Sequence, residues 1–236
     1  LDGQFSTSDT IYNHTYDYSG QVTQHSYLTK GVMLSLINDL KKKGGRMRVL
    51  IPSHLAYGIN GAGTGSSSGN NRVGGNQSLD YYVHLIDDQV KYDSVSIKNY
   101  MTANNLTGYI PVTVTYSPSG YDKDKRQYTM YYKITQAGTG STISPSATVE
   151  IQYTGILLNG ALTSDQYNTA DDTGLSVDLN DYDEPGLVQA LQYGSVGCKM
   201  SVILPSGLAY GPSGTTDGSI PANSCMRYDI NILSVQ

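Results

Sequence analysis

The sequence has no Trp and a single Phe, and charged residues make up only 15% of its 236 positions. Asp and Glu outnumber Lys and Arg by 20 to 15, which gives a formal net charge of -5 and argues against a nucleic-acid partner. No apolar run approaches the roughly 18 residues of a membrane span, and no signal-peptide pattern is visible. We therefore expect neither nucleic-acid binding nor a transmembrane segment in this chain.

Cysteine and histidine are also scarce, with two Cys and four His. Cys198 and Cys225 are compatible with one disulfide or with two buried thiols, and we favour free thiols. The histidines lack the spacing of metal ligands, and the acidic stretch 165–184 lacks the spacing of a calcium-binding loop. We expect no metal, no cofactor and a solvated loop at 165–184.

Tyrosine and glycine are abundant, with 21 Tyr and 26 Gly besides 8 Pro. Tyr favours strands, and Gly and Pro favour turns, so this composition favours β-structure.

A long internal repeat organises the chain. Residues 52–58 (PSHLAYG) recur as residues 205–211 (PSGLAYG), with six of the seven positions identical at a spacing of 153. The residues upstream match in the same register, and Tyr81 to Ile86 resembles Tyr228 to Leu233. A repeat this long indicates two copies of a domain rather than a solenoid.

Each copy combines strands with one helix. Alternation of apolar and polar residues predicts strands at 47–51 and 200–204, at 228–232, and at 148–153. Apolar residues at steps of three and four predict helices: a stripe of Val32, Met33, Leu36, Ile37 and Leu40, and a shorter helix from Pro185 to Leu191. The fold class is therefore α+β, with an antiparallel sheet and one short helix in each copy.

The segment between the copies predicts a further helix, followed by strands at 109–116 and 127–135. We expect one domain at 1–89, a linker helix at 90–107 and a second domain at 108–236. The first copy lacks the opening strands of the second. Either residues that precede Leu1 are missing, as its start without Met indicates, or Tyr109 to Tyr116 completes the first sheet; we favour missing residues.

Five segments of the second copy resemble the FKBP-type peptidyl-prolyl cis-trans isomerases in order and spacing. They are VEIQYTG at 149–155, LNG at 158–160, GCK at 197–199, LPSGLAYG at 204–211 and Ile-Pro at 220–221 before the Tyr228 strand. The resemblance extends over nearly all of residues 128–236, with a truncated equivalent at 1–88.

The resemblance implies an antiparallel sheet that wraps around a short helix, with an apolar pocket between them and no cofactor. It implies proline-containing polypeptides as clients and a role in protein folding. The tandem resembles exported bacterial members of the family, which implies a location in the cell envelope, periplasm or outer surface, with a lipid anchor upstream of Leu1.

The family's site residues carry over by position. Tyr210 and Tyr57 correspond to its catalytic tyrosine. The pocket positions in this sequence are Tyr153, Thr163, Ser164, Leu187, Ile220, Tyr228, Phe5, Met33, Val73 and Tyr81. Several depart from the family: its pocket Trp is replaced by Leu187 and by Met33 or Leu34, and its Phe-Asp pair by Thr163-Ser164 and by Phe5-Ser6. Two functions follow: we favour a weak peptidyl-prolyl isomerase, and the alternative is a peptide-binding or chaperone module without catalysis.

The resemblance also bears on the cysteines. In the family topology the strands that begin near Cys198 and Cys225 are antiparallel neighbours, so the two residues lie at opposite ends of the pair. At about 3.3 Å per residue, this separation exceeds the roughly 7 Å Cα limit for a disulfide. The resemblance thus implies free thiols.

Overall fold

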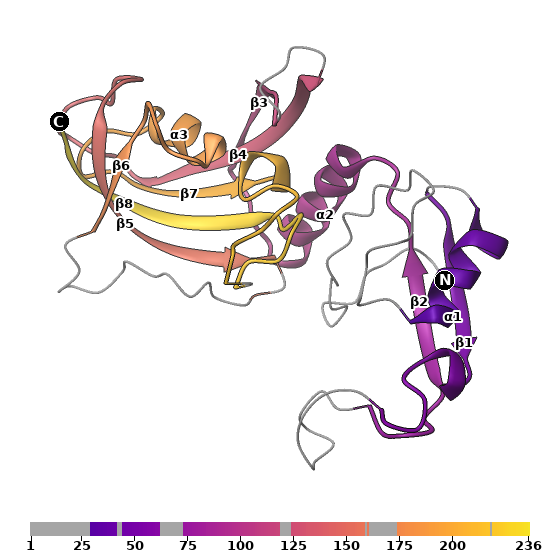
Figure 1. The fold of residues 1–236 in the computed structure, drawn as a ribbon. Helices are drawn as coiled ribbons and strands as arrows, with labels where there is room; N and C mark the ends of the chain where they lie inside the picture. Colours follow the sequence, from indigo (N-terminus) through magenta and orange to yellow (C-terminus); the bar gives the residue numbers. More distant parts are fainter. Residues whose placement is uncertain are drawn as a thin grey trace. The chain divides into compact units, whose positions relative to one another are not determined.

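The computed structural model describes residues 29–41, 44–61, 73–118, 124–158, 160, 174–217 and 219–236. The chain divides into two compact units, one of Tyr16–Asp88 and one that holds Gln89–Gln236 (Figure 1). Within the described ranges, no helix is both long enough and apolar enough to cross a membrane.

The N-terminal unit packs one helix on a two-stranded antiparallel sheet. Its elements are α1 (Lys30–Ser35), the π-helical turn η1 (Leu36–Leu40), β1 (Arg46–Ile51), the 3-10 turn η2 (Ser53–Leu55) and β2 (Leu79–His84). Val32, Leu36 and Ile51 form its buried core. The helix and the strand at 47–51 confirm the sequence prediction.

The predicted apolar stripe of this helix is wrong at Ile37, which is 48% exposed. The reason is the π-helical turn, in which the N–H of Lys41 bonds to the carbonyl of Leu36 at 3.0 Å. A π turn is wider than an α turn, so a stripe drawn at 3.6 residues per turn loses register there.

The C-terminal unit contains a six-stranded antiparallel sheet in the order β3-β4-β7-β8-β5-β6. Its strands are β3 (Ile110–Tyr116), β4 (Arg126–Gln136), β5 (Thr148–Leu157), β6 (Leu175–Asp178), β7 (Lys199–Leu204) and β8 (Met226–Val235). The expected strands at 148–153, 200–204 and 228–232 all lie within this sheet. The fold class is therefore α+β, as predicted.

Tyr109 to Tyr116 does not complete the first sheet. β3 pairs with β4 along its whole length, from Ile110 opposite Tyr132 to Tyr116 opposite Arg126. The segment therefore belongs to the sheet of the C-terminal unit. The expectation that residues precede Leu1 stays a prediction.

A helix packs on each face of this sheet. The inner face is the one that carries Tyr228 and Ile232, and the outer face is the opposite one. On the inner face, α3 (Pro185–Leu191) buries Leu187 and Leu191 against a core that includes Tyr228 and Ile232. On the outer face, α2 (Gln89–Ala103) buries Ile97 against Ile203 and Cys225.

α2 is also attached to the sheet by a buried polar network. The Asp93 carboxylate accepts hydrogen bonds from the Ser206 N–H at 2.9 Å, the Ser206 hydroxyl at 2.6 Å and the Gln89 side chain at 2.7 Å. Asp93 and Ser206 are both buried, and Ser206 begins the 3-10 turn η4 (Ser206–Leu208) that follows β7. The predicted boundaries at 89/90 and 107/108 stay a prediction, but this helix packs as part of the C-terminal unit.

The two cysteines are free, as expected. The register of β7 with β8 pairs Lys199 with Asn231 and Leu204 with Met226. Cys198 and Cys225 therefore lie at opposite ends of the strand pair, which confirms the topology from which this expectation came.

We expect Asp93→Ala to destabilise the C-terminal unit by roughly 2–4 kcal/mol, because it leaves the buried N–H and hydroxyl of Ser206 without their acceptor. Urea unfolding measures this change. Asn99→Ala, at an exposed position of the same helix, is the control. A loss no larger than that of the control would contradict the anchoring role of Asp93.

Candidate functional site

The loop after β7 positions Tyr210 at the edge of the inner-face core. Pro205 precedes η4, and Gly211 closes the turn with a φ of 60°, which favours glycine. The Gly211 N–H bonds to the Ser206 carbonyl at 2.9 Å, and the Gly211 carbonyl accepts the Asn223 N–H at 2.8 Å. Tyr210 is thus fixed by backbone bonds on both sides.

The same turn occurs in the N-terminal unit. Pro52 has φ and ψ of -65° and 152°, against -66° and 154° at Pro205. Gly58 has a φ of 62°, and its carbonyl accepts the Asn76 N–H at 2.8 Å. The repeat in the sequence is therefore also a repeat of backbone geometry around Tyr57.

The loops that follow the two turns correspond as well. Gly61 and Gly214 have φ values of 67° and 65°, and a side chain at either position would collide with a backbone carbonyl. That carbonyl belongs to Val73 in the first copy and to Ile220 in the second. The structure thus brings Val73 and Ile220 to equivalent places, as the sequence alignment expects.

Aromatic and aliphatic side chains gather beside Tyr210. Tyr153 of β5 and Tyr228 of β8 make an edge-to-face contact with ring centroids 5.7 Å apart. Leu187 and Ile220 belong to the same buried cluster, and Tyr210 packs against it. Tyr153, Leu187 and Tyr228 are 8%, 2% and 2% exposed, whereas Tyr210 is only half-buried.

Glu184 is the residue of this region that the sequence prediction missed. It was expected in a solvated loop, but it is 3% exposed. Its backbone carbonyl accepts the first bonds of α3, whereas its side chain makes no capping bond there. The carboxyl instead accepts the Tyr228 hydroxyl at 2.7 Å.

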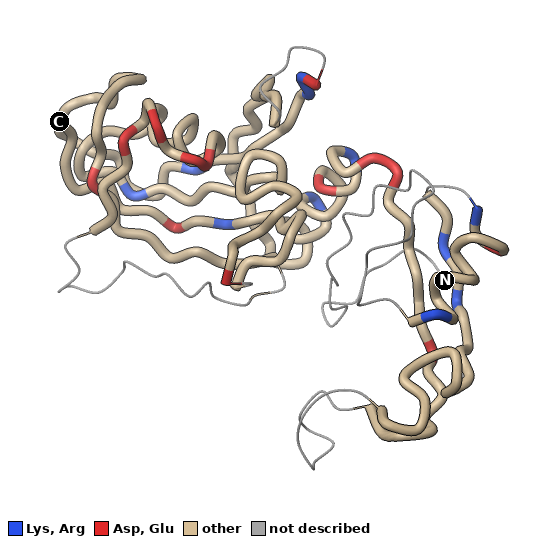
Figure 2. Tube along the Cα trace, in the orientation of Figure 1, with Lys and Arg blue, Asp and Glu red and all other residues tan. Residues whose placement is uncertain are grey.

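The charge of Glu184 has no basic partner nearby in the sequence, because no Lys or Arg occurs between Lys133 and Lys199. Figure 2 shows acidic residues on the segment that enters α3. Burial raises the pKa of Glu184, and the tyrosine hydroxyls only partly offset this effect. Burial and the Glu184 carboxyl together raise the pKa of Tyr210 and of Tyr228. A buried carboxyl and two un-ionised phenols therefore share this site.

The other predicted site residues lie outside the described residues or in the N-terminal unit. Phe5, Thr163 and Ser164 lie outside the described residues. Tyr57, Val73, Tyr81 and Met33 belong to the N-terminal unit, where Tyr81 packs on the core and Tyr57, Val73 and Met33 are half-buried.

Helix packing in the N-terminal unit favours Val32 over Met33 as the counterpart of Leu187. Gly31 lies against the side chain of Ile51, just as Gly186 lies against the side chain of Leu204. The residues that follow these two glycines, Val32 and Leu187, therefore occupy equivalent positions, and both are buried.

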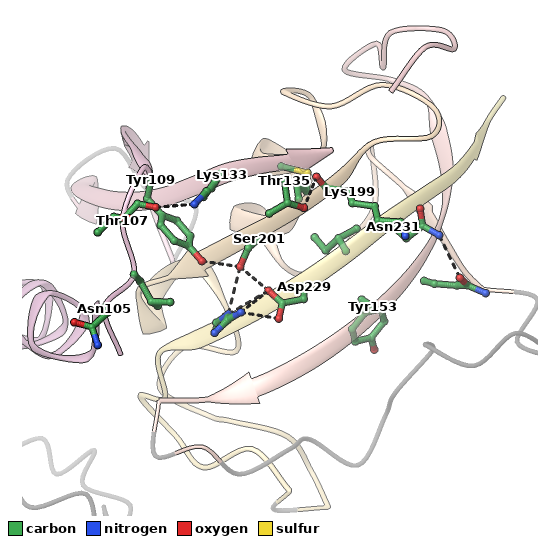
Figure 3. Close-up of a pocket in the computed structure, with 15 residues that line it drawn as sticks. Asn105, Thr107, Tyr109, Lys133, Thr135, Tyr153, Lys199, Ser201, Asp229 and Asn231 are labelled. Atoms are coloured by element: carbon green, nitrogen blue, oxygen red, sulfur yellow. Dashed lines mark hydrogen bonds and ion pairs between the residues drawn. The ribbon is translucent and has the colours of Figure 1, made fainter. Parts of the chain in front are cut away.

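A hollow lies on the outer face of the sheet, next to the end of α2 (Figure 3). It has a volume of about 560 Å³ and is lined mainly by polar side chains. Ser201 donates to Asp229 at 2.5 Å and accepts the Tyr109 hydroxyl at 2.9 Å, while Arg227 forms an ion pair with Asp229 at 2.8 Å. These groups satisfy one another. Among the described residues there is no cluster of His, Cys, Asp or Glu that could hold a metal ion.

We expect the free energy of unfolding to fall as pH rises through the pKa of Glu184 in the folded state. Burial raises that pKa above the ordinary value of 4.5, so the folded state binds the proton more tightly than the unfolded state. The resulting stabilisation is present below the unfolded-state pKa and is lost above the folded-state pKa. Glu184→Gln should reduce this loss, as urea unfolding between acidic and neutral pH measures.

Part of the pH dependence of the free energy of unfolding should remain in Glu184→Gln, because burial also raises the pKa of Asp93. Asp183→Asn, at an exposed neighbouring carboxyl, should keep the wild-type slope. If the free energy of unfolding fell equally with pH in Glu184→Gln and in the wild type, the attribution of this pH dependence to Glu184 would be wrong.

Similarity to known proteins covers the C-terminal unit in a family model and the whole chain in one relative. Residues 140–233 match the family described as FKBP-type peptidyl-prolyl cis-trans isomerase. Peptidyl-prolyl cis-trans isomerase FKBP9 of Rattus norvegicus is 26% identical over 238 residues, which cover 100% of this chain and 33% of the relative. Outer membrane protein MIP of Legionella longbeachae is 32% identical over 108 residues, or 45% of this chain and 44% of the relative.

The crystal structure of FkpA from Escherichia coli is also similar, with a TM-score of 0.46 and 26% identity over 62% of this chain and 61% of that one. The chain spans about a third of the FKBP9 relative and less than half of MIP. The family match covers the strands β5 to β8, the helix α3 and the Tyr210 turn. Residues 140–233 are therefore a domain of the FKBP-type peptidyl-prolyl cis-trans isomerase family.

Proposed function

We propose that the C-terminal unit catalyses cis-trans isomerisation of X–Pro bonds in polypeptides, at the cluster of Tyr153, Leu187, Tyr210, Ile220 and Tyr228. The membership of residues 140–233 in this enzyme family supports the reaction type. The gathering of these five residues in one cluster supports the location.

The chemistry needs no nucleophile and no metal. Rotation about an X–Pro bond passes through a twisted amide, with a barrier of about 20 kcal/mol that arises from lost conjugation. The twisted amide is less polar than the planar one, so an apolar wall of aromatic and aliphatic side chains favours it over the ground state. A hydroxyl at the rim can hold a carbonyl of the peptide while the bond rotates.

The observation that carries this proposal is the position of Tyr210. It packs against the buried cluster and yet stays half-buried, whereas Tyr153 and Tyr228 are buried. Its ring can therefore contribute to the apolar wall while a peptide approaches from the solvent side. Its turn is anchored to β7 and, through Ser206 and Asp93, to α2.

A second candidate function is a peptide-binding or chaperone module that does not catalyse. One observation favours it: the buried Glu184 carboxyl is hydrogen-bonded to Tyr228 within the cluster, which brings a polar group to a wall that the isomerase function needs apolar. Replacement of the family's Trp by Leu187 also leaves less aromatic surface in the pocket. The two functions are separable, because both bind prolyl peptides but only the first accelerates their isomerisation.

We extend the proposal to the remaining expectations. The two copies of the Tyr-Gly turn support a tandem of domains at 1–89 and 108–236 around the helix at 90–107. The relative named as an outer membrane protein supports a role in folding proline-containing clients in a bacterial envelope, with a lipid anchor as part of the same proposal. The FKBP9 relative is mammalian, so location is the less supported part.

We expect Tyr210→Phe to lower kcat/KM about fivefold, because one hydroxyl hydrogen bond contributes roughly 1 kcal/mol. A protease-coupled assay on a prolyl tetrapeptide measures this change. Tyr109→Phe removes a hydroxyl from the outer face and should leave the rate unchanged. Undetectable isomerisation by wild-type protein that still binds the peptide would reject catalysis and leave the binding module.

A further inference from the structure

The two copies differ in how the outer face of the sheet is covered. In the C-terminal unit, α2 packs on that face and buries Ile203 of β7 completely beneath Ile97. In the N-terminal unit the outer face is the one opposite α1, and there every second residue of β1 is exposed. Leu50 on this face is 71% exposed. The N-terminal unit therefore presents to solvent a face that a helix covers in the other copy.

Leu50 and Ile203 occupy equivalent positions. They lie 153 residues apart, which is the spacing of the repeated turn. Leu50 pairs with Asp80 of β2 and Ile203 with Arg227 of β8, in each case one pair before the end of the ladder. The residue after each of them packs against a glycine of the helix on the inner face, so both side chains point away from that helix.

The serine that begins each turn shows the same difference. Ser206 donates to the Asp93 carboxylate of α2 through its N–H at 2.9 Å and its hydroxyl at 2.6 Å. Ser53 begins the equivalent turn after β1, but among the described residues no carboxylate bonds to it. Asp93 and Ile97 are four residues apart in α2 and so lie on one face of the helix. One helix face thus supplies both contacts in the second copy.

We propose that the outer face of β1 and β2 binds an α-helix of another protein, one that carries an acidic residue followed four residues later by an aliphatic one. The aliphatic side chain covers Leu50, and the acid accepts the N–H and the hydroxyl of Ser53. These contacts are the ones that Ile97 and Asp93 make in the C-terminal unit. The proposal does not rest on the isomerase function, because it concerns the face opposite the helix of the other copy.

The side chains around Leu50 suit such a helix. Tyr82 is 63% exposed and lies diagonally from Leu50 on the same face, so the apolar surface extends over both strands. The face also carries Arg46 and Arg48, whereas β1 and β2 contain a single carboxylate, that of Asp80. Arg48 pairs with this carboxylate at 2.7 Å. The excess of positive charge favours a helix with an acidic side chain.

Neither α2 nor the segment before α1 fits as the occupant. Asp93 and Ile97 of α2 are both fully buried against the C-terminal unit. In residues 1–28 the acids are Asp2, Asp9 and Asp17, and the residues four positions later are Ser, Asn and Gln. That segment therefore lacks the spacing of acid and aliphatic residue that the face requires, and we assign the occupant to another protein.

The experiment uses the full chain, with a synthetic peptide of residues 89–103, the sequence of α2, as the probe. A side-chain staple in place of Lys91 and Val95, both exposed in α2, keeps the peptide helical, because an isolated helix of this length is marginal in water. Fluorescence anisotropy of the labelled peptide measures the affinity. Amide shifts of the nitrogen-15-labelled chain locate the site.

We expect saturable binding that shifts the amides of Leu50 and Ser53. Leu50→Ala should weaken binding about tenfold, because less apolar surface is buried. Asp93→Asn in the peptide should also weaken it about tenfold, because a neutral acceptor replaces the carboxylate. Ile37→Ala, at an exposed aliphatic residue of the helical segment on the other face, should bind as the wild type does. Thermal unfolding confirms that the compared chains are folded.

Three outcomes would overturn the proposal. The first is the absence of saturable binding, or equal affinity in the wild type and Leu50→Ala. The second is a set of shifts confined to Ile203 and Ser206, which would mean that the peptide replaces α2 at its own site. The third is self-association of the chain, measured by analytical ultracentrifugation, that Leu50→Ala abolishes; the occupant would then be a second copy. Since the peptide variant leaves the chain unchanged, its effect is independent of folding, and no readout depends on isomerase activity.

Discussion

Antiparallel pairing of β7 with β8 places Val202 opposite Tyr228 and Ser201 opposite Asp229. Side chains alternate between the faces of a sheet, so one face of this pair is apolar and the other is polar except at Ile203, which α2 covers. The apolar face is covered by α3 and forms the core beside which Tyr210 lies. The polar face carries the Arg227 ion pair and the outer hollow. The core beside Tyr210 and the outer hollow therefore both follow from the alternation of side chains along β7 and β8.

Two helices from different parts of the chain then fix the Tyr210 turn from opposite sides of the sheet. α2 holds the start of the turn through Asp93 and Ser206, and Glu184, which precedes α3, accepts the Tyr228 hydroxyl in the cluster beside the turn. Both carboxyls are buried, and burial raises the pKa of each. They differ in their partners, because Asp93 also accepts a backbone N–H whereas Glu184 meets tyrosine hydroxyls. The first contact is structural, and the second is directed at the candidate site.

The sequence was sufficient for features that depend on local pattern. Strand alternation was predicted because it follows from neighbouring residues, and the repeat of residues 52–58 at 205–211 was visible in the sequence before its common backbone was known. The opposite placement of Cys198 and Cys225 was expected from the topology that the resemblance implies. Ile37 could not be predicted, since a π turn changes the helical period. Glu184 was missed because an acidic stretch is typical of a solvated loop, and only the packing of α3 on the sheet buries this one carboxyl. The signals that could have found it are the Pro that follows it and the absence of Lys and Arg from 134 to 198.

The position of this carboxyl bears on how a pocket can change its chemistry without a change of fold. The resemblance expects an Asp after the LNG turn, where this chain has Ser164, and the expected Trp on the helix is Leu187. On that expected alignment the pocket has less apolar surface, but Glu184 brings an ionisable group to Tyr228 from the helix N-terminus. A buried carboxylate without a cation is costly, so the site favours the neutral acid or a ligand that supplies a hydrogen-bond donor. The buried Glu184 carboxyl therefore gives this cluster an ionisable group, while the Tyr210 turn keeps the backbone that it shares with the other copy.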